Sequence, residues 1–519
     1  MSLIKDDVFQ VVKSMTGTEK SYLKKFTSKH VIGTKNKSIV LFDLMNEQEE
    51  YDEKKILHSL NFKSQKNLSD LKSHLESLIV KSMNSYNAEH SIDRILRDWI
   101  GYIEFLQQKS LRTLALKVLH KTKKLSYKYE RYPQLLELLN LQYDLLIRGE
   151  HMPNKEEDIQ LILKEKKTAL SHINSFEEYR ILYSRISADI GGNPLLRSKA
   201  ERDKLHQLIK KYLKEDTRDL AFQTKLFRSY SLAFYYMAIA KFETANTIRK
   251  SAVELCLSNP ILVEENPYSI MFTLYVLAQV QYLSGKHDEL LETIKRYKNL
   301  TRDYPSILKN KSLESVIIFN AYNLEQSLYF ARGEYESAYS LLNVMQRDFK
   351  KFEHLMEKRM KLTFYVNSAM TYFVFEEYEK VLIWINRFLE ETRFDALRSI
   401  TLSVAKIVQL ISHFELGNTL FLEHITRSTY RFLLSKERLF KSEKAILQFI
   451  RKNSSKNKKQ ITAAFPELKK ELLQITKDPL EKNMLSVFDL VSYLESKITN
   501  KPQRLILKEK NKLLQNKKK

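Results

Sequence analysis

Apolar residues recur at helical spacing along most of this chain, and short turns interrupt them. The stretch from Leu313 to Phe352 is the clearest example, because two amphipathic helices flank the turn Arg332-Gly333-Glu334. Glycine suits this turn because it takes a positive φ without steric cost. A helix pair of this kind buries only part of its apolar surface alone, so we expect similar pairs stacked against it.

Turns of the same kind recur before and after this stretch. They begin at Ala240, Gly285, Gly333, Glu376 and Gly417, so the spacings are 45, 48, 43 and 41 residues. Small residues follow two of these turns, at Ala245 and Ala338, where the helices of a pair must approach closely. The pattern predicts an all-α fold built from a run of helical hairpins. With only 9 Gly and 9 Pro in 519 residues, the composition also argues against an all-β fold.

This arrangement resembles the tetratricopeptide repeat (TPR). The residues that carry the resemblance are small or aromatic and lie around two turns: Ala233, Tyr236, Phe242, Ala245, Ala252, Tyr329, Gly333, Tyr335 and Ala338. The spacing departs from the family period of about 34 residues, because these repeats are longer. With the segments TGTEKSYLKKF and STYRFLLSKERLFKSEKAILQFIRK, the chain resembles a bacterial family of uncharacterised TPR-like proteins. The resemblance implies an α-solenoid of degenerate TPR-like hairpins with a small N-terminal helical domain, and it implies no known activity.

The apolar pattern predicts five segments along the chain. They are an N-terminal helical domain (1–90), a long-helix region (91–190), the TPR-like solenoid (195–435), C-terminal capping helices (436–499) and a basic flexible tail (500–519). Thr16-Gly17-Thr18-Glu19 fits a capping box in the first segment. Gly191-Gly192-Asn193-Pro194 disfavours helix on both sides, so it marks either a domain boundary or a surface loop within one superhelix.

The net charge of +24 allows two interpretations. Basic runs at 109–131 and 501–519 fit a nucleic-acid-associated regulator, which we keep as the alternative function. However, 62 of the basic residues are Lys and 25 are Arg, and a lysine excess along the whole chain is typical of solvated helix faces. The N-terminus has no apolar signal region, and no run of eighteen apolar residues is present, so we expect a cytoplasmic protein without a membrane partner.

The sequence contains no pattern typical of an enzyme. It has no Gly-rich phosphate loop, no paired-cysteine motif and no Gly-x-Ser-x-Gly motif, so we expect no catalytic residue, no cofactor and no metal. The lone Cys256 lies among apolar residues, which indicates a buried thiol. The adjacent acids Glu376 and Glu377 diverge by about 100° around a helix and do not share a site.

The function expected from this pattern is a non-enzymatic interaction scaffold. Stacked helix pairs make a concave surface lined by the first helix of each pair, and such a surface can hold a protein or peptide. The candidate partner-binding residues on first helices are Asn323, Asn367, Tyr322 and Tyr365. Relative to its turn, Asn323 is displaced by one position from Asn367, which is about 100° around the helix. The identity of the partner does not follow from the sequence.

Overall fold

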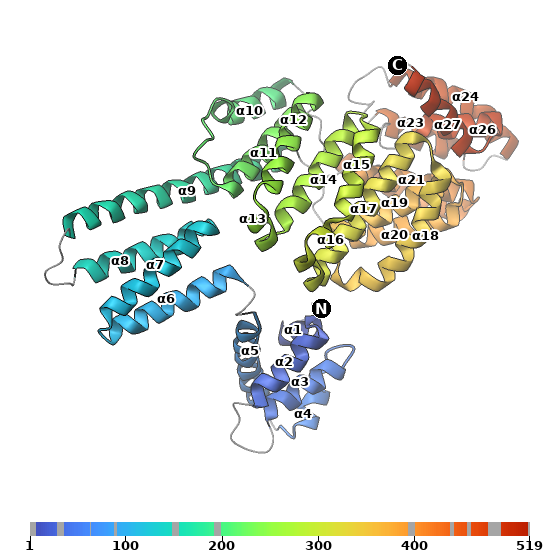
Figure 1. The fold of residues 1–519 in the computed structure, drawn as a ribbon. Helices are drawn as coiled ribbons and strands as arrows, with labels where there is room; N and C mark the ends of the chain where they lie inside the picture. Colours follow the sequence, from blue (N-terminus) through green and yellow to red (C-terminus); the bar gives the residue numbers. More distant parts are fainter. Residues whose placement is uncertain are drawn as a thin grey trace. The chain divides into compact units, whose positions relative to one another are not determined.

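The computed structural model describes residues 7–28, 36–62, 64–87, 91–147, 155–190, 199–392, 400–435, 441–453, 458–475 and 489–516. Within these ranges all regular structure is helical and no strand is present, which confirms the all-α prediction (Figure 1). Two compact units are formed, residues 1–173 and 174–519, and each is described by itself. No helix in the described ranges is long and apolar enough to cross a membrane.

Five helices at the N-terminus share one small core. They are α1 (Asp7–Ser14), α2 (Gly17–Ser28), α3 (Lys37–Glu47), α4 (Glu53–Ser59) and α5 (Gln65–Asn87). The buried residues of this core include Val12, Leu23, Phe42, Ile56 and Leu75. The predicted capping box is present, because the Thr16 amide donates to Glu19 Oε2 at 2.7 Å and the Glu19 amide donates to Thr16 Oγ1 at 3.3 Å.

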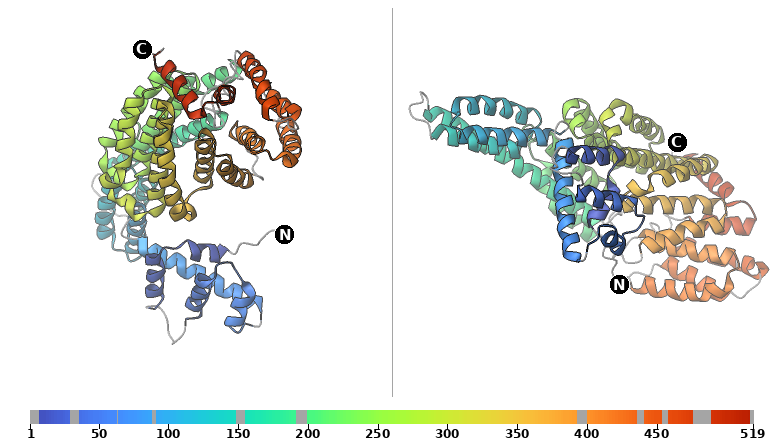
Figure 2. Two further views of the ribbon diagram at one scale, coloured as in Figure 1. Left: turned by 90° about the vertical axis from the view of Figure 1, so that its right-hand side faces the viewer. Right: turned by 90° about the horizontal axis from the view of Figure 1, so that it is seen from below.

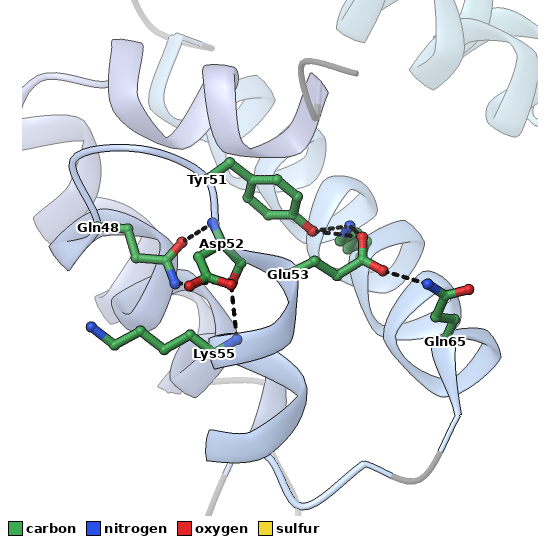
Figure 3. A network of polar contacts seen from close by, with 7 residues as sticks. Gln48, Tyr51, Asp52, Glu53, Lys55 and Gln65 are labelled. Atoms are coloured by element: carbon green, nitrogen blue, oxygen red, sulfur yellow. Dashed lines mark hydrogen bonds and ion pairs between the residues drawn. The ribbon is translucent and has the colours of Figure 1, made fainter. Parts of the chain in front are cut away.

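A polar network joins the α3–α4 loop to α5 (Figure 3). The Gln48 side chain bridges the main chain of Asp52, accepting from its amide at 3.0 Å and donating to its carbonyl at 3.2 Å. Glu53 accepts a hydrogen bond from Gln65 at 3.0 Å and forms an ion pair of 3.7 Å with Lys72. Because these short helices bury little surface each, such side-chain bonds fix the loop on its neighbour.

The next four helices are longer. They are α6 (Ile92–Gln108), α7 (Arg112–Lys128), α8 (Tyr132–Ile147) and α9 (Lys155–Ile190). Positive φ values at Ser110 (60°) and Glu130 (51°) reverse the chain between α6, α7 and α8. The first half of α9 packs Ile162 and Ala169 against α8, and its second half, beyond residue 173, packs against α11 in the other unit's core.

The second unit continues as a succession of helix pairs. Its helices are α10 (Lys199–Ile209), α11 (Phe222–Ala238), α12 (Phe242–Leu257), α13 (Pro260–Glu265), α14 (Tyr268–Leu283), α15 (His287–Lys298), α16 (Leu300–Asp303), α17 (Lys311–Arg332), α18 (Tyr335–Phe352), α19 (Lys358–Val374), α20 (Tyr378–Glu391), α21 (Ile400–Glu415), α22 (Thr419–Ser435), α23 (Lys441–Asn453), α24 (Lys458–Ile475), α26 (Leu490–Thr499) and α27 (Gln503–Asn516). Each long helix packs on the next, and Figure 2 shows the succession from two further sides.

All five turns predicted from the sequence have the same backbone geometry. The residues Ala240, Gly285, Gly333, Glu376 and Gly417 have φ between 60° and 74°. The amide after each one bonds back to a carbonyl five residues earlier, at 2.8 to 3.0 Å. This is the Schellman motif, which satisfies the free carbonyls at a helix end and reverses the chain. The tight helix approaches predicted at Ala245 and Ala338 are also present, since both side chains are fully buried.

The C-terminal segment differs from the flexible tail expected at 500–519. Residues 503–516 form α27, and Ile506 and Leu507 are buried. Leu507 packs with Tyr335 and Val374 in one apolar cluster. The apolar group in α27 is short, so the periodicity of the sequence did not predict a packed helix there. In the structure this group packs against an apolar surface at the α17–α18 turn. The join expected at 191–194 lies outside the described residues and stays a prediction.

Candidate partner-binding surface

Four helices of the second unit form one row. They are the first helices of successive pairs, α11, α14, α17 and α19, and each contacts the next in the row. The second helices are α12, α15, α18 and α20, and each of the first three contacts the members of the row before and after it. We call this set of four the first-helix row. It contains all four residues that the sequence proposed for partner binding.

The structure brings two of the proposed residues together. Asn367 Nδ2 in α19 donates to Asn323 Oδ1 in α17 at 3.1 Å, and both side chains are partly exposed. One turn further along, Gln326 donates to Thr371 Oγ1 at 2.7 Å in a buried contact. This buried bond fixes the register of α17 against α19, and so it aligns the two asparagines despite their one-residue offset relative to the turns.

The other two proposed residues take part in contacts between helices. The Tyr322 hydroxyl donates to Asp348 of α18 at 2.5 Å, and burial together with this carboxylate raises the pKa of Tyr322. Tyr365 is only 3% exposed and packs with Phe349 and Trp384 in the core between α18, α19 and α20. Both residues therefore stabilise helix packing, as most aromatic residues at helical spacing do.

An aromatic cluster occupies the α11–α14 end of the first-helix row. The Tyr183 ring of α9 lies 5.7 Å from Phe227, 5.8 Å from Phe234 and 6.3 Å from Phe272, measured between ring centroids. Tyr268 stacks on Phe272 at 5.9 Å with an interplanar angle of 8°, and it is 52% exposed. The cluster therefore presents at least one open ring face to solvent.

A cation lies close to this cluster. Burial raises the pKa of Tyr183, and the positive charge of Arg359 opposes that rise. Arg359 acts on Tyr275 in the same direction. Arg359 is exposed at the start of α19, so the row presents a guanidinium whose charge acts on Tyr183 and Tyr275.

Behind the aromatic cluster lies a fully buried arginine that the sequence did not single out. Arg249 of α12 is 0% exposed and stacks on the Tyr230 ring at 4.5 Å. It donates to Ser229 Oγ at 3.1 Å and to the Thr273 carbonyl at 2.9 Å. Burial lowers the pKa of Arg249 and raises the pKa of the neighbouring Cys256 to about 11. The thiol is therefore buried, as the sequence indicated, and its raised pKa keeps it protonated. The arginine links three helices.

Other clusters of polar residues serve packing. Glu376 pairs with Lys497 of α26, whereas Glu377 accepts from Tyr339, so the two adjacent acids have separate partners as predicted. A hollow between α24 and α26 is lined by Pro466, Lys469, Lys470, Leu473, Gln474 and Ile498, and it is open to solvent. Within the described ranges, no group of three or more His, Cys, Asp or Glu side chains could hold a metal ion.

Comparison with known proteins identifies no relative. No family model matches the chain, and neither the curated proteins nor the solved structures contain a match.

Proposed function

We propose that this protein is a non-enzymatic interaction scaffold that binds a protein segment along the first-helix row. The observation that carries the proposal is the pair Asn323–Asn367, in which two partly exposed amides from adjacent first helices meet at 3.1 Å. Each amide uses one polar atom in this contact. Asn323 Nδ2 and Asn367 Oδ1 remain for a partner, and they match the carbonyl and amide of one extended peptide unit.

The rest of the row supplies the other contacts that a peptide needs. The open ring face of Tyr268 offers apolar area at low conformational cost. Arg359 offers a bidentate donor for a carboxylate. The expected ligand is an extended segment with an acidic residue and at least one aromatic or large apolar side chain.

The proposal includes the architecture that the sequence resemblance implies. We infer that α11 to α22 form an α-solenoid of degenerate TPR-like hairpins. The five turns with positive φ and the buried alanines at 245 and 338 support this inference. In such a solenoid the first helices line the concave surface, which is why a segment bound there could contact several repeats at once.

The test is selection of binding peptides with the full chain, followed by affinity measurement on variants. We expect Asn323→Ala/Asn367→Ala to weaken the selected peptides at least tenfold, because two hydrogen bonds to the peptide backbone are lost. Asn343→Ala is the matched control, since Asn343 is an exposed amide on the second helix α18. Arg359→Gln should weaken acidic peptides and leave neutral ones unchanged.

Two results would contradict the proposal. One is that the selected peptides bind the double variant and the Asn343→Ala control equally well. The other is selection of no peptide by the wild-type chain, together with turnover on a substrate panel. The first result would mean that the peptide-binding site lies elsewhere on the chain. The second would mean that the chain is not an interaction scaffold.

A further inference from the structure

Helix α6 carries a ladder of three exposed aromatic side chains. Trp99 is 38% exposed, Tyr102 41% and Phe105 47%. Their ring centroids are 6.0 Å apart from Trp99 to Tyr102 and 6.3 Å apart from Tyr102 to Phe105. The core of this helix lies elsewhere, at Leu96, Ile100, Ile103 and Leu106, which are buried. The three rings therefore form a second, solvent-facing stripe.

Positive charge lies next to this stripe. Lys121 Nζ of α7 is 5.8 Å from the Trp99 ring centroid, and Lys109 Nζ is 5.8 Å from that of Phe105. Between residues 112 and 128, α7 has no acidic residue, and its lysines at 117, 121, 124 and 128 are exposed. None of these four forms an ion pair with a described residue, whereas Lys123 is paired with Glu165 at 2.6 Å. The charge on this side of α7 is therefore available to an anionic partner.

We propose that this surface binds single-stranded nucleic acid. We define it as the α6–α7 face, consisting of Trp99, Tyr102, Phe105, Lys109, Lys117 and Lys121. Bases stack on the three rings, and phosphates lie against the lysines. Stacking on aromatic side chains beside a basic groove is the usual means of holding a single strand without sequence preference. A duplex is a poorer ligand because its bases already stack on one another.

The composition of the face favours nucleic acid over a lipid surface. Asp98 and Glu104 are exposed on α6 close to the rings. Insertion of the rings into a bilayer would carry these carboxylates toward the anionic headgroups and the acyl boundary, which is unfavourable. Flat stacking of bases on the rings leaves both carboxylates in water. The basic run that the sequence identified at 109–131 is therefore one side of a mixed aromatic and cationic surface.

Fluorescence anisotropy with the full chain tests this assignment. The probes are labelled 20-nucleotide oligo-dT, oligo-U and a duplex of equal length, at salt concentrations from 50 to 300 mM. We expect saturable binding of both single strands and binding of the duplex at least tenfold weaker. Tyr102→Ala/Phe105→Ala should weaken single-strand binding about tenfold or more. Lys117→Gln/Lys121→Gln should reduce the slope of log affinity against log salt by about 1.4, at about 0.7 per phosphate contact.

Matched controls separate this face from other parts of the chain. Leu161→Ala removes an exposed apolar side chain from α9, since Leu161 is 57% exposed. Lys508→Gln/Lys512→Gln removes two exposed charges from α27, within the other basic run. Neither control should change the affinity for oligo-dT more than twofold. Thermal unfolding of each variant confirms that it is folded.

A spectroscopic measurement reports on the stacking itself. The chain contains two tryptophans, Trp99 and Trp384, so in a Trp384→Phe variant the emission comes from Trp99 alone. Oligo-dT should quench this emission with the same midpoint as the anisotropy change. The assignment is overturned if no single strand binds at 50 mM salt, or if the control variants lose as much affinity as the face variants. Binding to anionic vesicles without binding to oligonucleotides, or self-association blocked by Tyr102→Ala/Phe105→Ala, would also overturn it.

Discussion

The side-chain amide of Asn511 donates a hydrogen bond of 3.1 Å to the main-chain oxygen of Phe330, which precedes it by 181 residues. The same amide donates to the Tyr335 hydroxyl at 3.0 Å. These two acceptors lie on either side of Gly333, whose missing side chain leaves α27 room to approach the turn. The helix at the C-terminal end is therefore attached to the turn that best defines the repeated pattern.

Replacement of Asn511 should loosen this attachment. We expect Asn511→Ala to lower the free energy of unfolding by about 1–2 kcal/mol, because two partly buried hydrogen bonds are lost. Chemical denaturation measures the change, and Lys512→Ala, at an exposed position beside it, serves as the control. A double-mutant cycle with Tyr335→Phe should give a coupling of about 0.5–1 kcal/mol. Zero coupling would mean that the Asn511–Tyr335 contact does not contribute to stability.

A second attachment depends on Lys497 of α26. Its Nζ lies 2.9 Å from Glu376 and 3.1 Å from Glu415, and these side chains are 20%, 30% and 17% exposed. We expect Lys497→Met to cost about 2–3 kcal/mol, below the range for fully buried pairs, because water still reaches the carboxylates. Lys501→Met is the matched control. Lys501 and its partner Glu509 are more than half exposed, so its loss should change stability by at most about 0.5 kcal/mol.

The close approach of α17 and α18 is tested by Ala338. Ala338 is fully buried, and we expect Ala338→Leu to overpack this contact and to cost about 1–3 kcal/mol. Ser337→Leu places the same side chain on the exposed face of α18, one residue away, and should leave the melting temperature nearly unchanged. Equal melting temperatures for the two variants would show that the helices do not meet at residue 338.

Local signals in the sequence predicted the local structure well. A positive φ at Gly333 or at Ala240 follows from the need to end a helix and reverse the chain within a few residues. The burial of Ala338 follows from the position of a small residue one turn into the second helix. Such features depend on residues that are close together in the chain, so a single sequence is enough to predict them.

Contacts between distant segments could not be predicted in this way. Nothing in the residues around Asn511 indicates Phe330 as its partner, because the contact exists only after several helix pairs have stacked. The pairing of Asn323 with Asn367 depends on the relative register of two helices, which the buried bond from Gln326 to Thr371 fixes. The exposure of Trp99 could not be predicted either, because hydrophobic periodicity counts apolar residues and not the width of the face that a neighbouring helix covers.

His413 should make stability depend on pH near neutrality. Burial lowers the pKa of His413 below its usual 6.5, and its ring Nδ1 lies 3.1 Å from the side-chain nitrogen Nδ2 of Asn418. The unfolded chain therefore binds a proton more readily than the folded chain. The resulting stability is fully present above pH 6.5 and is lost as the pH falls through the folded-state pKa. Melting temperatures measured from pH 7.5 to 5.0 should fall more steeply for the wild type than for His413→Gln, and parallel curves would exclude this contribution.

Two opposing effects determine the stability of the buried charge on Arg249. Its guanidinium gains from the Tyr230 ring and from two hydrogen bonds, but burial disfavours the charge, and Nε has no hydrogen-bond partner. None of its described contacts is with a carboxylate, so no opposite charge offsets the desolvation. Replacement even of a buried ion pair by well-packed apolar side chains of similar volume is often neutral, whereas a buried charge that loses its partners is costly. We therefore expect Arg249→Met to change the free energy of unfolding by at most about 1 kcal/mol.

Arg249→Lys should lower the free energy of unfolding by about 2–3 kcal/mol, because an ammonium cannot reach both Ser229 and the Thr273 carbonyl as the planar guanidinium does. Chemical denaturation of both variants gives the comparison, and a larger loss for methionine than for lysine would show that the charge itself holds α11, α12 and α14 together.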